Sequence, residues 1–131
     1  MLCFCLMPNH YHLVLRQIEA RGISRLMRST ITAYVSYFNR RHGRSGPLFA
    51  SPYRAAPIED SLQFRTAIAY VHTNHASGPG YRWCSHSAYE RFAEDPTSAP
   101  SWLDIDYVLK RFGGFAAYQR FLEAYIQRRR R

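Results

Sequence analysis

Near its amino terminus the chain reads LCFCLMPNHYHLVLR, at residues 2–16. Two short apolar runs, residues 2–6 and 11–16, lie on either side of Met7-Pro8-Asn9. Proline and asparagine favour a turn, and proline is poorly tolerated within a central strand, so this order of residues predicts a β-hairpin.

Two histidines follow the predicted turn. Because successive side chains of a strand point to opposite faces, His10 and His12 are expected on one face, about 7 Å apart along the chain, with Tyr11 on the other face. Two imidazoles in this arrangement can chelate one cation. A His-x-His pair in a strand is more often part of a polar sheet face, so the pair alone does not establish a metal site.

A long amphipathic helix is predicted after the hairpin. Apolar side chains recur at the spacing of one helix face from residue 23 to residue 38, and Gly43 ends the pattern. The stripe consists of Ile23, Leu26, Met27, Thr30, Ile31, Tyr34, Val35 and Phe38. The opposite face carries Arg25, Arg28 and short polar side chains that could lie along a phosphate backbone.

Three further helices are predicted. Asp60 and Gln63 resemble a capping box, which predicts a helix from about residue 61 to residue 75, ended by Gly78-Pro79-Gly80. Helical spacing also predicts a short helix at residues 103–112 and another at residues 115–128. The apolar side of the last helix is expected to consist of Phe121, Ala124 and Tyr125.

The remaining segments are predicted to be irregular. Glycine and proline punctuate residues 43–57, but this segment also contains Leu48-Phe49 and Tyr53-Arg54-Ala55-Ala56. A loop that runs into an irregular or edge strand is therefore predicted here. Residues 81–100 are predicted to be mostly loop. The four terminal arginines, residues 128–131, are expected to form a solvated tail.

Composition limits the class of protein. The chain has 131 residues, of which 47% are hydrophobic, and this length predicts a single compact domain with a core. No apolar run approaches the length of a membrane helix, and no secretion leader is recognisable. The three cysteines lack the paired spacing of a zinc site or a disulfide framework. A soluble, cytoplasmic protein is expected.

The charge points to a polyanionic partner. The formal net charge is +9, and Lys110 is the only lysine. The planar guanidinium donates to phosphate oxygens and stacks on bases, which makes nucleic acid the first partner to consider. An arginine-rich composition that only solvates the surface is an equal alternative on charge alone.

Tyr70 and Asn74 are spaced four residues apart on a predicted helix, so they share one face. An amide oxygen could complete a histidine-bound site for a hard divalent ion, and a phenol one turn away could attack a phosphorus atom polarised by that ion. Without further signals, an ordinary half-buried helix tyrosine is the simpler interpretation.

A series of motifs resembles one family. Residues 6–15, LMPNHYHLVL, resemble the histidine-hydrophobic-histidine motif of the single-tyrosine HUH transposases, specifically the REP-associated tyrosine transposases. Further motifs follow in the family's order and spacing as far as about Tyr125. They are Tyr37-Phe38-Asn39-Arg40-Arg41-His42-Gly43, Gly46 with Leu48-Phe49, Tyr53-Arg54, Tyr70-Val71-His72-Thr73-Asn74, Trp83 with Ser85, and Trp102-Leu103-Asp104.

The resemblance implies an α+β, ferredoxin-like HUH transposase fold, in which the sheet presents His10 and His12 and the helix bearing Tyr70 packs nearby. It further implies that His10, His12 and Asn74 bind Mg²⁺ or Mn²⁺ and that Tyr70 is the nucleophile. Enzymes of this kind cleave and rejoin single-stranded DNA beside palindromic hairpins through a 5′-phosphotyrosine link, without ATP.

The resemblance also implies a role for the arginines in binding hairpin DNA. The candidates are Arg25, Arg28, Arg40, Arg41 and Arg54. Tyr53, Trp83 and Tyr89 could stack on bases, although packing is the more common role of large aromatics in a small domain. His42, His72 and His75 are not expected to be ligands, and His72 is expected to pack or to form a hydrogen bond.

The family normally has a strand and a helix before the histidine hairpin, so the fold is expected to be N-terminally truncated, with residues 1–80 as catalytic core and residues 81–131 as a loop and helical extension. A fragment, a mis-started frame and a decayed copy are all compatible with this. Pro52 stands where the family usually has a basic residue, and His75 replaces a common proline.

Three functions therefore stay open. The first is a metal-dependent DNA-strand transesterase, monomeric or homodimeric, with no membrane partner. The second is a catalytically inactive hairpin-binding remnant or regulator. The third is a nuclease in which water attacks and Tyr70 only packs.

Overall fold

The computed structural model describes residues 1–74 and 81–131. The chain divides into two compact units, one formed by Met1–Leu15 with Ile58–Arg131 and the other by Arg16–Pro57. The prediction of a single compact domain is therefore replaced by two units. The predicted division into a catalytic core at residues 1–80 and an extension at residues 81–131 stays a prediction; helices described after residue 80 pack on the helix before it.

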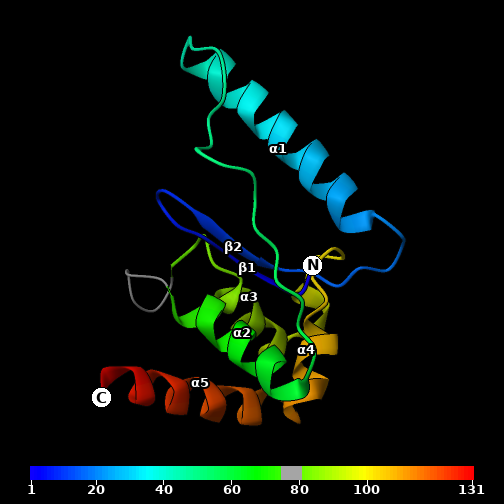
Figure 1. The fold of residues 1–131 in the computed structure, drawn as a ribbon. Coiled ribbons are helices and arrows are strands. Elements are labelled where there is room, and N and C mark those ends of the chain that lie inside the picture. Colours follow the sequence, from blue (N-terminus) through cyan, green and yellow to red (C-terminus); the bar gives the residue numbers. More distant parts are fainter. Residues whose placement is uncertain (75–80) are drawn as a thin grey trace. The chain divides into compact units, whose positions relative to one another are not determined.

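The first unit begins with the predicted hairpin (Figure 1). Strand β1, Cys3–Leu6, pairs antiparallel with β2, Tyr11–Val14, in a register that sets Cys5 opposite His12. The turn is closed by a 2.8 Å hydrogen bond in which the Met7 amide donates to the His10 carbonyl. The prediction of a hairpin around Pro8 is confirmed.

The second edge of β1 is also paired. The Leu6 amide donates to the Trp83 carbonyl, and the Ser85 amide donates to the Phe4 carbonyl, at 2.8 and 2.9 Å. An isolated antiparallel bridge joins Cys5 to Cys84. Strand β1 therefore has a partner on each edge, which holds the hairpin firmly in the unit.

Helix α2, Ser61–Thr73, is the helix that the capping box predicts. The Asp60 carboxylate accepts from the amides of Leu62 and Gln63, both at 2.8 Å, and the Gln63 side chain accepts from the Glu59 amide at 2.9 Å. The predicted end near His75 and the terminating Gly78-Pro79-Gly80 lie outside the described residues.

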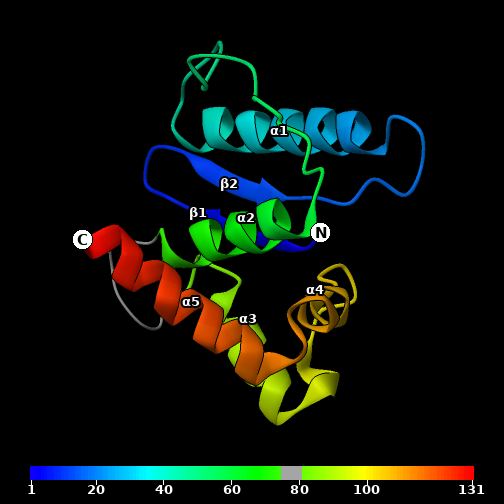
Figure 2. The same cartoon turned by 60° about the horizontal axis from the view of Figure 1, so that its bottom comes forward.

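Three more α-helices and a short 3₁₀ helix complete the first unit. They are α3, His86–Glu94; η1, Pro96–Ser98; α4, Ile105–Phe112; and α5, Phe115–Arg130. Helix α2 packs against both strands and against α5, and so lies between the hairpin and α5 (Figures 1 and 2). The helices predicted at 103–112 and 115–128 are confirmed, the second with two more residues.

The prediction that residues 81–100 are mostly loop is wrong, because α3 and η1 occupy much of this segment. Ala88 and Tyr89 of α3 are buried, and the Tyr89 hydroxyl donates to the Leu2 carbonyl at 2.6 Å. Helix α3 has only nine residues, and the periodicity of its sequence alone does not predict it. It is stabilised because one of its faces is buried against the rest of the unit.

The core of the first unit gathers around α2. Its buried side chains come from the hairpin, from α2 and from every later α-helix. On α5 the deepest residues are Tyr118 and Leu122, whereas the predicted Phe121 and Tyr125 are only half-buried and Ala124 is exposed. All three cysteines are free and buried.

A buried polar network crosses this core. The two ring nitrogens of His72 lie 2.7 Å from the Tyr118 hydroxyl and 2.8 Å from the Ser85 hydroxyl, and Ser85 also accepts from the Phe4 amide at 2.9 Å. Burial raises the pKa of Tyr118, so its phenol stays protonated. The expected hydrogen-bonding role of His72 is confirmed.

The second unit contains one long helix, α1, Gly22–Arg41, as predicted. Gly43 follows it with a φ of 59°, a conformation that favours glycine. Of the predicted apolar stripe, Met27 is buried, but Leu26 and Tyr34 are 42% and 47% exposed.

The irregular or edge strand predicted at residues 53–56 is not formed; this segment has no regular secondary structure. Pro52 and Pro57 lack amide donors at its two ends, and the second unit contains no other described strand with which it could pair.

Across the described residues the protein is thus a mixed α+β chain with five α-helices and a two-stranded antiparallel sheet. None of the helices in that part of the chain combines the length and the apolar character that crossing a membrane requires.

Candidate functional site

The hairpin brings the two predicted metal ligands together. His10 directly precedes β2 and His12 lies within it, and the centroids of their rings are 5.0 Å apart at an interplanar angle of 83°. His10 is exposed and His12 is half-buried. The pair therefore lies at the end of the hairpin with one ring open to solvent.

The Nε2 atom of His12 has an unusual environment. Its Nε2 is buried and has no hydrogen-bond partner among the described residues. Burial, and secondarily the charge of nearby His10, lower the pKa of His12, which keeps the imidazole neutral. A buried nitrogen without a partner costs free energy, so this position suits a ligand that interacts with it.

Asn9 fixes the other imidazole. Its Oδ1 lies 2.7 Å from His10 Nδ1, so the amide oxygen accepts a hydrogen bond from that nitrogen. This assignment leaves the lone pair of His10 on Nε2. Metal-binding histidines commonly donate their second ring nitrogen in this way, which sets both tautomer and ring orientation.

Helix α2 supplies the predicted nucleophile. It packs on β1 and β2, and the Tyr70 ring centroid lies 5.1 Å from that of His12, nearly edge-to-face at 76°. Tyr70 is 36% exposed. The structure therefore brings His10, His12 and Tyr70 into one cluster on the surface of the first unit.

Asn74 ends α2 as its C-cap, one turn beyond Tyr70, and is half-buried. No hydrogen bond joins its amide to either imidazole within residues 1–74 and 81–131. Asn74 is thus near the end of the helix that carries Tyr70, and its part in metal binding stays a prediction.

The donor set is compatible with a divalent cation. Two imidazole nitrogens are available, one of them buried without a partner among the described residues, and amide or phosphate oxygens could complete the coordination. Among the described residues, no group of three or more His, Cys, Asp or Glu side chains is arranged to hold a metal. An ion here would therefore need oxygen ligands from Asn74 or from a substrate.

One neighbour of Tyr70 was not predicted from the sequence. The guanidinium carbon of Arg129, near the end of α5, lies 5.6 Å from the Tyr70 ring centroid and 5.9 Å from that of Tyr125. The spacing of Tyr125 and Arg129 on a predicted helix indicates that they are neighbours, but no local pattern relates either to Tyr70.

The predicted DNA-binding arginines all belong to the second unit. Four of them lie on α1, and Arg54 follows in the irregular segment. The four are Arg25, Arg28, Arg40 and Arg41. All five are exposed, as phosphate contacts require, and none belongs to the unit that contains Tyr70.

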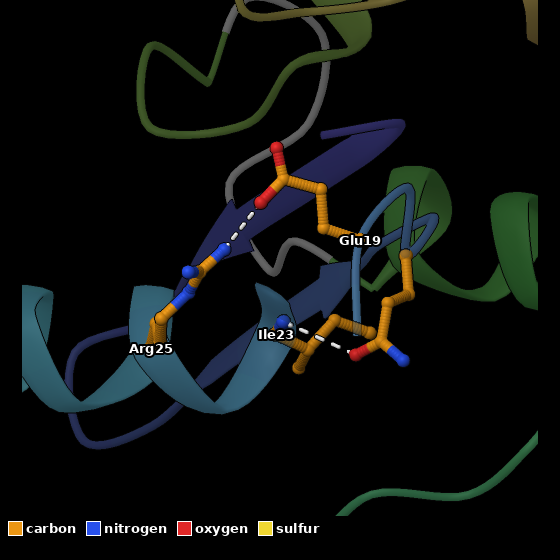
Figure 3. A network of polar contacts seen from close by, with 4 residues as sticks. Glu19, Ile23 and Arg25 are labelled. Carbon is orange, nitrogen blue, oxygen red and sulfur yellow. Dashed lines mark hydrogen bonds and ion pairs between the residues drawn. The ribbon is translucent and has the colours of Figure 1, made fainter. Parts of the chain in front are cut away.

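Arg25 already has an acidic partner. Figure 3 shows its guanidinium paired with the Glu19 carboxylate. The nearest nitrogen and oxygen of this pair are 2.5 Å apart, and nearby in sequence the Ile23 amide donates to the Gln17 side chain at 3.3 Å. Both charged groups are largely exposed, so the pair adds little stability and leaves Arg25 a weaker candidate than Arg28.

The aromatic residues predicted as base-stacking candidates differ in how far they are buried. Tyr89 is fully buried and packs, whereas Tyr53 and Trp83 are 44% and 50% exposed and remain able to stack on bases. His42 contacts Phe38 within the second unit, with ring centroids 4.3 Å apart. His75 lies outside the described residues.

Comparisons with protein-family models, with curated proteins and with solved structures give no match for this chain. The interpretation of the cluster therefore rests on its own geometry and on the motif resemblance.

Proposed function

We propose that this protein is a transesterase that cleaves and rejoins single-stranded DNA next to palindromic hairpins, with Tyr70 as the nucleophile. The observation that carries the proposal is the cluster of His10, His12 and Tyr70, with ring centroids 5.0 and 5.1 Å apart and an unpartnered His12 Nε2. Paired imidazoles beside a phenol are the groups that metal-assisted attack on a phosphodiester requires.

The proposal includes a ferredoxin-like HUH fold. A histidine-bearing hairpin with a tyrosine-bearing helix packed on both strands supports it, since this is the arrangement that the motif resemblance implies. The mixed α+β character of the chain agrees with it.

His10, His12 and Asn74 would hold Mg²⁺ or Mn²⁺, which would polarise the phosphate oxygens when bound. His12 is suited to this because its pKa is lowered and its ring is neutral. Asn9 supports His10 by fixing the ring that would point its free nitrogen at the ion.

Tyr70 performs the bond exchange. Its phenol loses a proton to solvent and its oxygen attacks the phosphorus; the P–O3′ bond breaks, and the leaving 3′ oxygen takes up a proton. The tyrosine–phosphate bond conserves the energy of the phosphodiester, so a 3′-hydroxyl can reverse the step without ATP. Tyr70 is suited to this role because a third of its surface is exposed to an approaching strand.

The test is covalent trapping. Labelled oligonucleotides carrying candidate hairpins are incubated with protein and Mn²⁺, and a denaturing gel should show a protein–DNA adduct that is absent in Tyr70→Phe. Tyr37→Phe is the matched control, since Tyr37 is also an exposed helix tyrosine but belongs to the second unit. An adduct that persists in Tyr70→Phe would refute the nucleophile assignment.

A hairpin-binding protein without catalysis is the second candidate. It is favoured by one observation: the predicted DNA-binding arginines lie in a different compact unit from Tyr70, so binding does not require the cluster. DNA binding without any adduct would support this candidate. Cleavage that releases free 5′-phosphate ends without an adduct would instead indicate a nuclease that uses water.

A further inference from the structure

The arginine-rich end of the chain is helical. A solvated tail is the simplest expectation for residues 128–131, but α5 continues to Arg130. Since α5 packs against α2, the last turn of this helix is held beside the helix that carries Tyr70. The carboxy-terminal arginines are thereby linked to the candidate site.

Arg129 is the member of this group that reaches the site. Its guanidinium lies near two aromatic rings from two helices, 5.6 Å from the centroid of Tyr70 on α2 and 5.9 Å from that of Tyr125 on α5. Guanidinium groups at such distances are attracted by the negative faces of aromatic rings. This attraction orients the side chain while leaving its charge exposed.

The donors of Arg129 are unused. In the described part of the chain Arg129 forms neither a hydrogen bond nor an ion pair, unlike Arg25 or Arg44. A guanidinium has five N–H groups in a planar fork that matches two phosphate oxygens. Arg129 is therefore a cation placed beside Tyr70 with its anion-binding capacity intact.

We propose that Arg129 binds the phosphate that Tyr70 attacks; this inference rests on the proposed function. The guanidinium carbon lies 5.6 Å from the centroid of the ring that carries the attacking oxygen, and a phosphorus atom must come within about 3 Å of that oxygen for reaction. A phosphate in this position is within reach of the long arginine side chain. Arg129 would thus be a catalytic residue on a helix remote in sequence from the histidines.

Charge supports this assignment. His10 and His12 would contribute nitrogen ligands to a bound ion, whereas the Arg129 guanidinium is a positive group beside the Tyr70 ring, next to the phosphate. Attack on a phosphodiester builds additional negative charge on its non-bridging oxygens. A guanidinium that donates to these oxygens stabilises the transition state more than the ground state.

The test compares Arg129→Gln with Arg128→Gln, which removes the same charge from the same helical turn. Single-turnover adduct formation is measured at saturating DNA. The expected result is a loss of roughly 100-fold in rate for Arg129→Gln, a partial loss for Arg129→Lys, and less than about threefold for Arg128→Gln. Circular dichroism of each variant confirms that α5 is retained.

A modified substrate separates a phosphate contact from a structural effect. With a methylphosphonate at the cleavage position, the charged oxygen is missing, so wild type and Arg129→Gln should form adduct at similar rates. Equal rates for Arg129→Gln and Arg128→Gln on the normal substrate, or a defect that persists on the methylphosphonate, would overturn the inference and leave the proposed function standing. A wild-type protein that forms no adduct would overturn both.

Discussion

At the residue scale, the two imidazoles differ in a chemically useful way. His10 is exposed and its Nδ1 is bound to Asn9, whereas His12 has a buried Nε2 without a partner. The His10 ring is oriented by its hydrogen bond to Asn9, and the His12 ring is oriented by the residues that bury it. Both are left with a nitrogen lone pair, which is what a cation requires.

The first prediction concerns this pair. His12→Ala and His10→Ala should each lower Mn²⁺ affinity by at least about tenfold, measured by electron paramagnetic resonance of free Mn²⁺. Burial lowers the pKa of His12, so protonation of this ring should weaken binding at a lower pH than it would for an ordinary histidine, whose pKa is about 6.5.

His42→Ala is the control for Mn²⁺ binding, because His42 is an exposed histidine in the second unit. It should leave the affinity unchanged. Wild-type affinity in His12→Ala would contradict the assignment of His12 as a ligand.

The second prediction concerns the free thiols. Burial raises the pKa of Cys84 to about 12 and also raises the pKa of Cys3, so both thiols stay protonated at about pH 8. Intact-mass spectrometry should show slow alkylation by iodoacetamide in the native protein and rapid alkylation of all three cysteines in urea. Rapid native alkylation of Cys84 would show that the segment after Trp83 does not stay paired with β1.

At the element scale, α2 is set by local signals at its start and by packing along its length. Asp60 caps two amides, and Gln63 reaches back to the Glu59 amide. The buried face of α2 includes Ile68 and Val71, whereas Tyr70 points to the surface. The cap fixes where the helix begins, and burial fixes which face Tyr70 occupies.

The third prediction tests this cap. Asp60→Ala should lower the free energy of unfolding by about 1 kcal/mol, because two amides of the first turn lose their acceptor. Urea denaturation followed by circular dichroism provides the measurement. Glu123→Ala, an exposed change on α5, should alter stability by less than about 0.5 kcal/mol. Equal effects of the two substitutions would show that the cap does not stabilise α2.

At the scale of the whole molecule, the first unit is joined by a single polar network. His72 on α2 connects Tyr118 on α5 with Ser85, which in turn binds the backbone of β1. These groups are nearly inaccessible to solvent. Each therefore depends on the others for its hydrogen bonds, which ties the hairpin, α2 and α5 into one arrangement.

The fourth prediction is that His72→Phe lowers the free energy of unfolding by about 2–4 kcal/mol, because it leaves the buried Tyr118 hydroxyl without its partner and removes one hydrogen bond of the buried Ser85 hydroxyl. Tyr118→Phe removes only one hydroxyl of the network, so it should lower the free energy of unfolding by about half as much. Urea titration of both variants checks this. A His72→Phe protein as stable as the wild type would show that the network contributes no net stability.

The fifth prediction concerns the second unit and the net charge of +9. If Arg40 and Arg41 contact phosphates, replacing both by glutamine should weaken binding of hairpin DNA and lower the slope of log affinity against log salt by roughly 1.5–2. The rate of adduct formation at saturating DNA should not change, since Tyr70 belongs to the other unit. An unchanged salt slope would exclude these two arginines as phosphate contacts.

Local patterns were sufficient for most elements. The turn at Pro8 with apolar runs on both sides, the cap at Asp60 and the long stripe from Ile23 each predicted an element that the structure contains. They were not sufficient for α3, which is short and depends on the burial of Tyr89. They were also misleading at residues 53–56, where a strand-like composition has no partner to pair with.

The sequence by itself determined the hairpin, the capped helix and the closeness of His10 to His12, because these depend on residues a few positions apart. Only the tertiary structure decided that Tyr70 lies beside His12, that His12 Nε2 is buried without a partner, and that Arg129 stands over the Tyr70 ring. These contacts join segments about sixty residues apart, and they form because hydrophobic burial packs α2 against both the hairpin and α5.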